Sequence, residues 1–256
     1  MLKLMQINLK NKNALVTGAS RGIGRSIALE LAACGARVAM QYHENHNRAR
    51  KVSELIGPRS ELFQADFSDP IEVSSLFYNV LLKMKHIDIL VNNAGVALHS
   101  DPTGSDLEWM DQWLRTMEIN LNAAGFLCKK AIEHFLSREG GIIINIASRA
   151  AFRGDTQDYM AYAASKGGLV SLTRTIARSY GKRGIIAFAV APGFVNTDMA
   201  QPFIEAYGAD YAVRDIALDK LTEPEDVARL VAFLASGMAN HATGSTFDMN
   251  AGSYMR

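Results

Sequence analysis

Short apolar runs alternate with longer stretches of helical periodicity along the whole of this 256-residue sequence. Runs such as IDILVNN, GIIINIAS and GIIAFAVA are apolar throughout, which is typical of strands that are covered on both faces. Strands that alternate with helices form β-α-β units on a parallel sheet. The sequence therefore predicts an α/β fold in which helices cover a parallel sheet.

The apolar runs and the helix-start signals set the expected boundaries. Pro70 and Pro224 suit the first turn of a helix, where a missing N–H costs nothing, and Asp69 and Glu223 precede them. Strands are expected at Ala14–Thr17, Arg37–Tyr42, Glu61–Gln64, Ile87–Asn92, Gly141–Ala147, Ile185–Ala191 and Ser245–Met249. Helices are expected at Gly22–Cys34, Arg48–Ile56, Pro70–Lys85, Asp106–Ile119, Asn122–Leu136, Tyr159–Tyr180 and Pro224–Ser236.

No repeat, low-complexity tract or linker divides the chain, so a single domain over residues 1–256 is expected. The segment Asn196–Leu221 fits the alternation least well. It mixes polar residues with Met199, Phe203, Ile204, Tyr207 and Tyr211. Because ligands bind at the carboxyl ends of the strands in open α/β sheets, this segment is a candidate lid over a substrate. An ordinary pair of surface helices is the alternative.

Charge and cysteine content narrow the possible partners. The 27 Lys and Arg residues nearly balance the 26 Asp and Glu residues, so nothing favours nucleic acid or an anionic membrane as a partner. The two cysteines, Cys34 and Cys128, are expected to be free, buried apolar groups, and the six histidines form no metal-binding pattern. No signal sequence or membrane span is evident, and a cytoplasmic location is expected.

A glycine-rich turn follows the first expected strand. The strand ALVT leads into GASRGIG, and the helical pattern SIALELAACG comes next. Gly18, Gly22 and Gly24 have no Cβ, so a pyrophosphate could approach the backbone N–H groups at the start of the helix. The spacing is G-x-x-x-G-x-G rather than the common G-x-G-x-x-G. Its position between strand and helix predicts a dinucleotide site.

The residues around the adenosine ribose predict which dinucleotide binds. Arg21 precedes Gly22, and a guanidinium at that place suits a 2′-phosphate. NAD enzymes place an acid at the tip of the second strand to hold the ribose hydroxyls, where this chain has Tyr42 and His43. The pattern favours NADP(H) over NAD(H). Glu44 is the counter-argument, because a small error in register would bring its carboxylate toward the ribose.

Two residues in the segment YAASKGGLVSLTRTIA have the spacing of a catalytic pair. Tyr162 and Lys166 lie four residues apart, which places them on one helix face about one turn apart. The strand GIIINIAS delivers Ser148 at its carboxyl end, fourteen residues before Tyr162. Tyr-x-x-x-Lys alone occurs often by chance, and its meaning comes from the serine-bearing strand that precedes it.

From about Asn13 to Ser253 the sequence resembles the short-chain dehydrogenase/reductase family. The motifs that carry the resemblance, in the family's order, are TGASRGIG, the NNAG of residues 92–95, Asn120, Ser148, Tyr162-x-x-x-Lys166 and the Pro192-Gly193 turn. The resemblance implies a Rossmann-type, doubly wound fold with seven parallel strands and helices on both faces. It also implies an enzyme that interconverts a carbonyl and a secondary alcohol by hydride transfer.

Roles follow from the matching positions. Tyr162 would transfer the proton, Ser148 would bind the substrate oxygen, Lys166 would hold the nicotinamide ribose, and Asn120 would position a water molecule. The cofactor contacts implied are Gly18, Ser20, Arg21, Gly22, Ile23, Gly24, Tyr42, Asp66, Phe67, Asn93, Ala94, Gly95, Tyr162, Lys166, Pro192, Gly193, Val195 and Thr197.

Tyr162 must lose its proton for alcohol oxidation near neutral pH. The pKa of a free tyrosine is about 10, so a shift of roughly three units, or about 4 kcal/mol, is needed. An ammonium about 4 Å away supplies about that Coulomb energy at an effective dielectric constant near 20. We therefore expect Lys166 to lower the pKa of Tyr162.

The leading substrate hypothesis is a 3-oxoacyl thioester on a carrier protein or coenzyme A. Arg138 and Arg183 match positions where 3-oxoacyl carrier-protein reductases of this family present basic residues to an acidic carrier. Arg149 and Arg153 could meet an acidic substrate group or simply be solvated. The alternatives are a sugar, polyol or steroid-like alcohol dehydrogenase and a catalytically silent nucleotide-binding regulatory protein.

Three of the expected helices bear on the oligomeric state. The expected helices at 106–119, 122–136 and 159–180 carry apolar residues on more than one face. In the resembled family these helices pack into a four-helix dimer interface, and two dimers commonly form a tetramer. We therefore expect a homotetramer.

Overall fold

Seven strands form one parallel sheet in the computed structural model, which describes residues 6–198 and 213–255. Neighbouring strands follow the order β3-β2-β1-β4-β5-β6-β7, and all six pairs are parallel. The chain reverses its direction of travel across the sheet between β1 and β4, the arrangement that creates a ligand crevice at the carboxyl ends of the strands. The strands are β1 (Asn13–Val16), β2 (Arg37–Tyr42), β3 (Ser60–Gln64), β4 (Ile89–Asn92), β5 (Gly141–Ile146), β6 (Ile185–Pro192) and β7 (Thr246–Met249).

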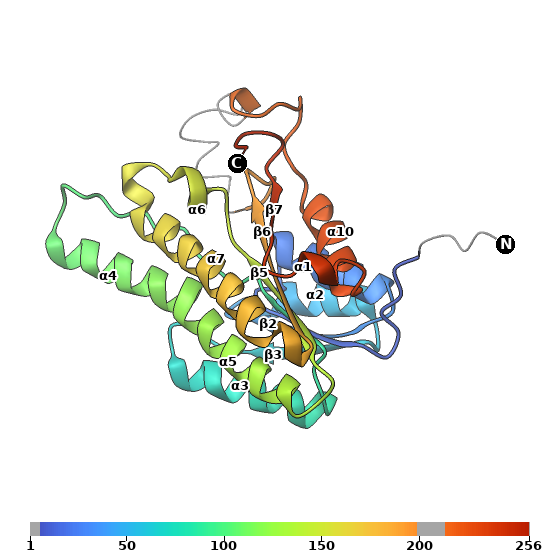
Figure 1. Ribbon diagram of the computed structural model, residues 1–256. Helices are drawn as coiled ribbons and strands as arrows, with labels where there is room; N and C mark the ends of the chain where they lie inside the picture. Colours follow the sequence, from blue (N-terminus) through green and yellow to red (C-terminus); the bar gives the residue numbers. More distant parts are fainter. Residues whose placement is uncertain (1–5, 199–212, 256) are drawn as a thin grey trace.

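Helices cover both faces of this sheet (Figure 1). One face is covered by α1 (Gly22–Ala33), α2 (His46–Ile56) and α10 (Pro224–Ala235). The other is covered by α3 (Pro70–Met84), α5 (Ala123–Leu136) and α7 (Met160–Tyr180), with α4 (Asp106–Met117) alongside α7. The doubly wound fold expected from the sequence is confirmed.

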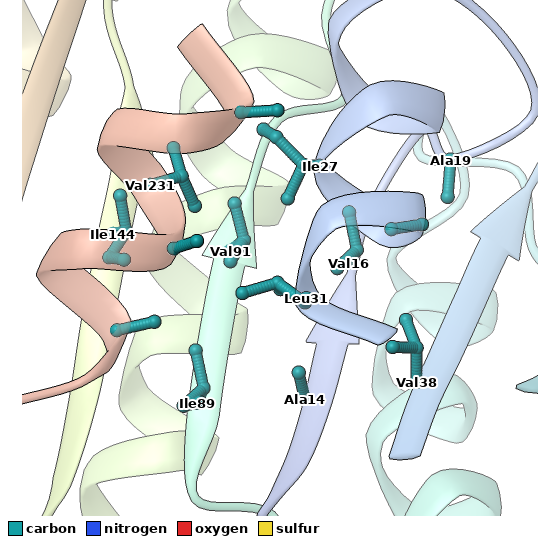
Figure 2. Packing of buried hydrophobic residues seen from close by; sticks show 14 of the residues in the cluster. Ala14, Val16, Ala19, Ile27, Leu31, Val38, Ile89, Val91, Ile144 and Val231 are labelled. Atoms are coloured by element: carbon teal, nitrogen blue, oxygen red, sulfur yellow. The ribbon is translucent and has the colours of Figure 1, made fainter. Parts of the chain in front are cut away.

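The core lies in two layers, one on each side of the sheet. Figure 2 shows Ile27 and Leu31 of α1 and Val231 of α10 against the side chains of β1 and β4. All three side chains are fully buried. Burial of an aliphatic side chain of this size contributes about 1.5–3 kcal/mol, so this packing fixes where the strand ends lie.

The main departure from the expected boundaries lies between α4 and α5. The sequence predicts two helices that meet near residues 119–122, whereas the structure continues through a π-helical turn, η1 (Glu118–Asn122). The other boundaries differ from expectation by no more than two residues. Within the described ranges, no helix has the length and apolar character needed to cross a bilayer.

The expected burial of the two cysteines and the expected lid agree with the structure only in part. Cys128 is buried, and burial raises the pKa of its thiol to about 12, but Cys34 is only half-buried. Most of the expected lid, including its five apolar residues, lies outside the described residues. The described flanks, 196–198 and 213–221, stand next to the site considered below.

Candidate active site

A cavity of about 580 Å³ opens at the carboxyl ends of the strands. Its walls come from the turns that follow six strands, beginning with Gly18 after β1 and ending with Gly193 after β6. The crevice expected from the topology is therefore present.

The turn after β1 brings backbone close to backbone. Gly18 has φ +65°, and a Cβ on Gly24 would collide with the carbonyl oxygen of Gly18. Gln41 of β2 holds the turn, because its side-chain oxygen accepts from Gly18 N at 2.8 Å and its amide donates to Ala65 O at 2.7 Å. The first turn of α1 starts at Gly22, so its free N–H groups face the cavity in the manner that suits a pyrophosphate.

Two arginines meet one carboxylate at the adenosine side of the cavity. Arg21 and Arg48 both line the cavity, and their Nη1 atoms lie 3.8 Å and 2.6 Å from Oδ2 of Asp198. Two guanidinium groups that converge on one anionic oxygen suit a phosphate dianion. These donors and the glycine turn together fit a phosphorylated dinucleotide.

The ring of Tyr42 lies away from the cavity, contrary to the expected cofactor contact. Tyr42 is buried and its hydroxyl bonds Nδ1 of His46 at 2.8 Å. Its neighbours Gln41 and His43 line the cavity instead. The reason is strand alternation, since successive side chains point to opposite faces.

Asp66 lies beside His43 at the same edge, 3.4 Å from its Nε2. Burial acts to raise the pKa of Asp66, but hydrogen bonds from Ser68 and the nearby His43 outweigh it and lower this pKa. The carboxylate is therefore held in its charged, hydrogen-bond-accepting form.

The NNAG turn after β4 is fastened to β1. The hydroxyl of Thr17 accepts from the backbone N of both Asn93 and Ala94 at 2.9 Å, and the side chain of Asn93 donates to Thr17 O at 2.8 Å. The sequence analysis did not identify Thr17, which lies behind the cavity wall, or Gln41, which lines the cavity. Polar residues inside or next to apolar strands were the available signal.

Asn120 sits in η1 and is fully buried. It accepts from Val96 N at 2.8 Å and donates to Val96 O at 2.9 Å and to Ser165 Oγ at 3.1 Å. It lies behind the cavity wall, joining the segment after β4 to α7. These bonds link it to the helix that carries Lys166.

Ser148, Tyr162 and Lys166 all line the cavity. Lys166 Nζ lies 5.6 Å from the centre of the Tyr162 ring and donates to Ile146 O at 2.9 Å. The hydroxyl of Ser148 is hydrogen-bonded to the phenol of Tyr162. The amine and the phenol therefore face the same space, as the four-residue spacing predicts.

The expected effect of Lys166 on Tyr162 is wrong for this structure. Burial raises the pKa of Tyr162, Ser148 lowers it and the carboxylate of Asp155 raises it again, so that it ends above the ordinary value. Burial also lowers the pKa of Lys166 to about 8. Desolvation disfavours the charged form of both groups, and Lys166 is not among the groups that shift the pKa of Tyr162.

The cavity brings together the other residues expected to contact the cofactor. Asn120 and Tyr42 are the two predicted site residues that do not line it. The predicted residues that do are Gly18, Ser20, Arg21, Gly22, Ile23, Gly24, Asp66, Phe67, Asn93, Ala94, Gly95, Ser148, Tyr162, Lys166, Pro192, Gly193, Val195 and Thr197.

The basic residues considered for substrate binding fall into two places. Arg149 and Arg153 line the cavity. Arg138 and Arg183 are exposed just before β5 and β6 begin, at the opposite edge of the sheet. Among residues 6–198 and 213–255, no cluster of three or more metal-ligating side chains occurs.

Known proteins resemble this chain over nearly its whole length. A family model described as enoyl-(acyl carrier protein) reductase matches residues 18–253. The 3-oxoacyl-(acyl-carrier-protein) reductase FabG of Staphylococcus epidermidis is 38% identical over 249 residues, covering 96% of this chain and 100% of that protein. The 3-oxoacyl-(acyl-carrier-protein) reductase of Synechocystis is 38% identical, with coverage of 94% and 96%.

The crystal structure of a short chain dehydrogenase from Burkholderia cenocepacia in complex with NADP superposes with a TM-score of 0.88. The identity is 35%, and the match covers 96% of this chain and 99% of the other.

Proposed function

The chain belongs to the short-chain dehydrogenase/reductase family and is an oxidoreductase acting on CH–OH groups, and we propose that it reduces 3-oxoacyl thioesters with NADPH. The thioester substrate is supported by the names of the relatives that are 38% identical over nearly the full chain. The observation that carries the reaction is the common cavity of Ser148, Tyr162 and Lys166, next to a glycine turn that suits a dinucleotide.

NADP(H) is the proposed cofactor. Arg21 and Arg48 provide paired guanidinium donors at the adenosine side, and a similar structure binds NADP. The cofactor supplies the hydride to the carbonyl carbon when it is bound. The glycine turn, Asp66 and the NNAG turn would hold its pyrophosphate, adenine and ribose portions.

The protein's own residues then act on the carbonyl oxygen. Ser148 would donate a hydrogen bond to that oxygen and stabilise the negative charge that develops there. Tyr162 would deliver its phenolic proton to the same oxygen, which completes the alcohol. Because burial raises the pKa of Tyr162, the phenol keeps its proton through the neutral range and is suited to reduction.

Lys166 would support this step in two ways. Its buried ammonium faces Tyr162, so that it stabilises the phenolate left after proton transfer. Its hydrogen bond to Ile146 O fixes it where it can also hold a ribose hydroxyl. Asn120 would keep α7 in place through its bonds to Val96 and Ser165.

The test is NADPH oxidation with a panel of 3-oxoacyl thioesters, simple ketones and sugars. We expect the thioesters to be reduced, and Tyr162→Phe to lower kcat/KM by a factor of about 10² to 10⁴, the contribution typical of a general acid. NADPH binding by this variant, followed by fluorescence, should persist.

If the wild-type protein binds NADPH but reduces no carbonyl compound, a regulatory role replaces the enzymatic one. Reduction of sugars or simple ketones without thioester reduction would retain the chemistry and reject the substrate. Docking of a carrier protein on Arg138 and Arg183, a homotetramer and a cytoplasmic location remain predictions of the same proposal. The role of 196–221 as a lid is also a prediction.

A further inference from the structure

Two arginines on the wall of the cavity share one carboxylate. Arg149 follows Ser148 directly, and Arg153 ends the short helix α6 (Ala150–Arg153). Nη1 of Arg149 lies 3.1 Å from Oδ2 of Asp215, and Nη1 of Arg153 bonds the same oxygen. Two guanidinium groups therefore converge on one carboxylate oxygen, and both arginines line the cavity that also holds Tyr162.

Arg149 is not a solvated surface arginine. It is 8% exposed, and its guanidinium carbon lies 4.6 Å from the centre of the Phe194 ring. Its backbone N donates to Pro192 O at 3.0 Å, which fixes it beside the turn after β6. Burial and the nearby Arg153 lower the pKa of Arg149. An anion beside this guanidinium therefore stabilises its charged form.

Asp215 is a partner that another carboxylate can replace. Its side chain is 46% exposed, so it can return to water when its place is taken. The pair that Asp215 makes with Arg153 is exposed on both sides, and exposed ion pairs of this kind contribute little to stability. The position of Asp215 also demonstrates that a carboxylate fits between the two guanidinium groups.

We propose that Arg149 and Arg153 bind a carboxylate of the substrate in the place of Asp215. The inference rests on the proposed function and deepens it. The preferred substrate is an oxo compound with a carboxylate beyond its reacting carbonyl, either a free oxo acid or an oxoacyl thioester whose acyl chain ends in a carboxylate. Paired guanidinium donors recognise the planar carboxylate through charge-assisted hydrogen bonds, whereas a neutral ester offers a weaker acceptor.

The test compares matched substrates with NADPH. One pair is 4-oxopentanoate and its methyl ester, and the other is the N-acetylcysteamine thioesters of 3-oxohexanedioic and 3-oxohexanoic acid. We expect kcat/KM to favour the carboxylate member of at least one pair by about tenfold or more, as a charge-assisted hydrogen bond gives. The pair that responds shows whether the carboxylate belongs to a free acid or to a thioester.

Variants then identify the groups responsible. Arg153→Gln should lower kcat/KM for the carboxylate member at least tenfold more than for the neutral member. Asp215→Asn should raise kcat/KM for the carboxylate member, because the competing anion is removed. Arg214→Gln is the control, because Arg214 is exposed next to Asp215 and does not line the cavity. This variant should leave kcat/KM unchanged for both members of the pair.

Two results would overturn the inference while leaving the proposed function intact: equal kcat/KM values for both members of each pair, or equal losses for both members in Arg153→Gln and Asp215→Asn. The second result would mean that the ion pairs only hold the 213–217 segment.

Calorimetric binding of 4-oxopentanoate to the NADPH complex gives a readout that does not need turnover. Binding lost in Arg153→Gln supports the site even if no carbonyl compound is reduced. Absence of binding by the wild type, together with equal kcat/KM values within the thioester pair, rejects it.

Discussion

Tyr162 and Lys166 share a helix face, yet burial moves their pKa values in opposite directions. The pKa of the phenol rises and the pKa of the ammonium falls to about 8. Both shifts favour the neutral form, as expected where side chains leave water. At neutral pH the phenol therefore holds its proton, which is the state that carbonyl reduction requires.

Asp155 sets the pH range of the reverse reaction. Alcohol oxidation needs the phenolate of Tyr162, and the carboxylate of Asp155 raises the pKa of that phenol further. We expect Asp155→Asn to move the alkaline rise of the oxidation rate to lower pH, measured as kcat/KM between pH 6 and 10. Asp158→Asn, a carboxylate of the same loop that does not act on Tyr162, is the control. An unchanged or upward-shifted profile in Asp155→Asn would refute this role.

Lys166 should reduce stability while it supports catalysis. Its pKa is about 8 in the folded protein against an ordinary value of 10.5, so between these values the unfolded chain binds more protons. The free energy of unfolding therefore rises with pH through this window, and below pH 8 the burial of the ammonium costs about 3 kcal/mol.

We expect Lys166→Met to be inactive yet more stable than the wild type at pH 7 in urea unfolding. The difference should narrow as the pH approaches 10. A variant less stable than the wild type at pH 7, or a difference that does not depend on pH, would contradict the assigned cost.

Most of the predicted site residues line the cavity, and they were predicted from the resemblance to the family, whose motifs the sequence carries in order. The exceptions have physical reasons. Tyr42 was expected at the cavity because it ends β2, but its side chain turns to His46 and does not line the cavity. Whether the pKa of Tyr162 rises or falls depends on how completely the site excludes water. A spacing of four residues carries no information about this.

At the scale of elements, the apolar runs located every strand of the sheet, but not the continuity between α4 and α5. Two helices were expected to meet near residue 120, whereas η1 joins them through a π-helical turn. The turn coincides with Asn120, whose side chain bonds the backbone of Val96. A tertiary contact between segments 24 residues apart decides this geometry, and local periodicity gives no sign of it.

The loops after β1 and β6 and the start of α2 meet at Asp198, and their charges should set the cofactor preference. We expect Arg21→Ala to weaken NADPH binding about tenfold or more and NADH binding much less, because only NADPH carries the 2′-phosphate. Asp198→Asn should tighten NADPH binding, since it removes a carboxylate that competes for Arg21 and Arg48.

Fluorescence titration with both cofactors measures these effects. Arg25→Ala is the matched control, because Arg25 lies one turn into α1 and does not line the cavity. Equal losses for NADPH and NADH in Arg21→Ala would argue that the guanidinium supports the turn rather than the phosphate.

For the whole molecule, the outer face of α4 argues for assembly. Leu107 is 82% exposed and Leu114 59% exposed, and Met110 lies between them with its side chain also exposed. These residues recur every three or four positions, so they form one apolar stripe along the helix. Contiguous apolar surface of this kind usually marks a protein interface.

We expect the protein to be a tetramer by light scattering at micromolar concentration, and Leu114→Glu to dissociate it, since a buried unpaired carboxylate is strongly disfavoured. Leu82→Glu on α3, where the leucine is 55% exposed, should leave the assembly unchanged. A wild-type monomer would disprove the expected assembly. The glycine turn, Arg21 and the NNAG turn all come from the same chain, so NADPH binding should survive dissociation. Any loss of turnover in Leu114→Glu would then measure what assembly contributes to catalysis.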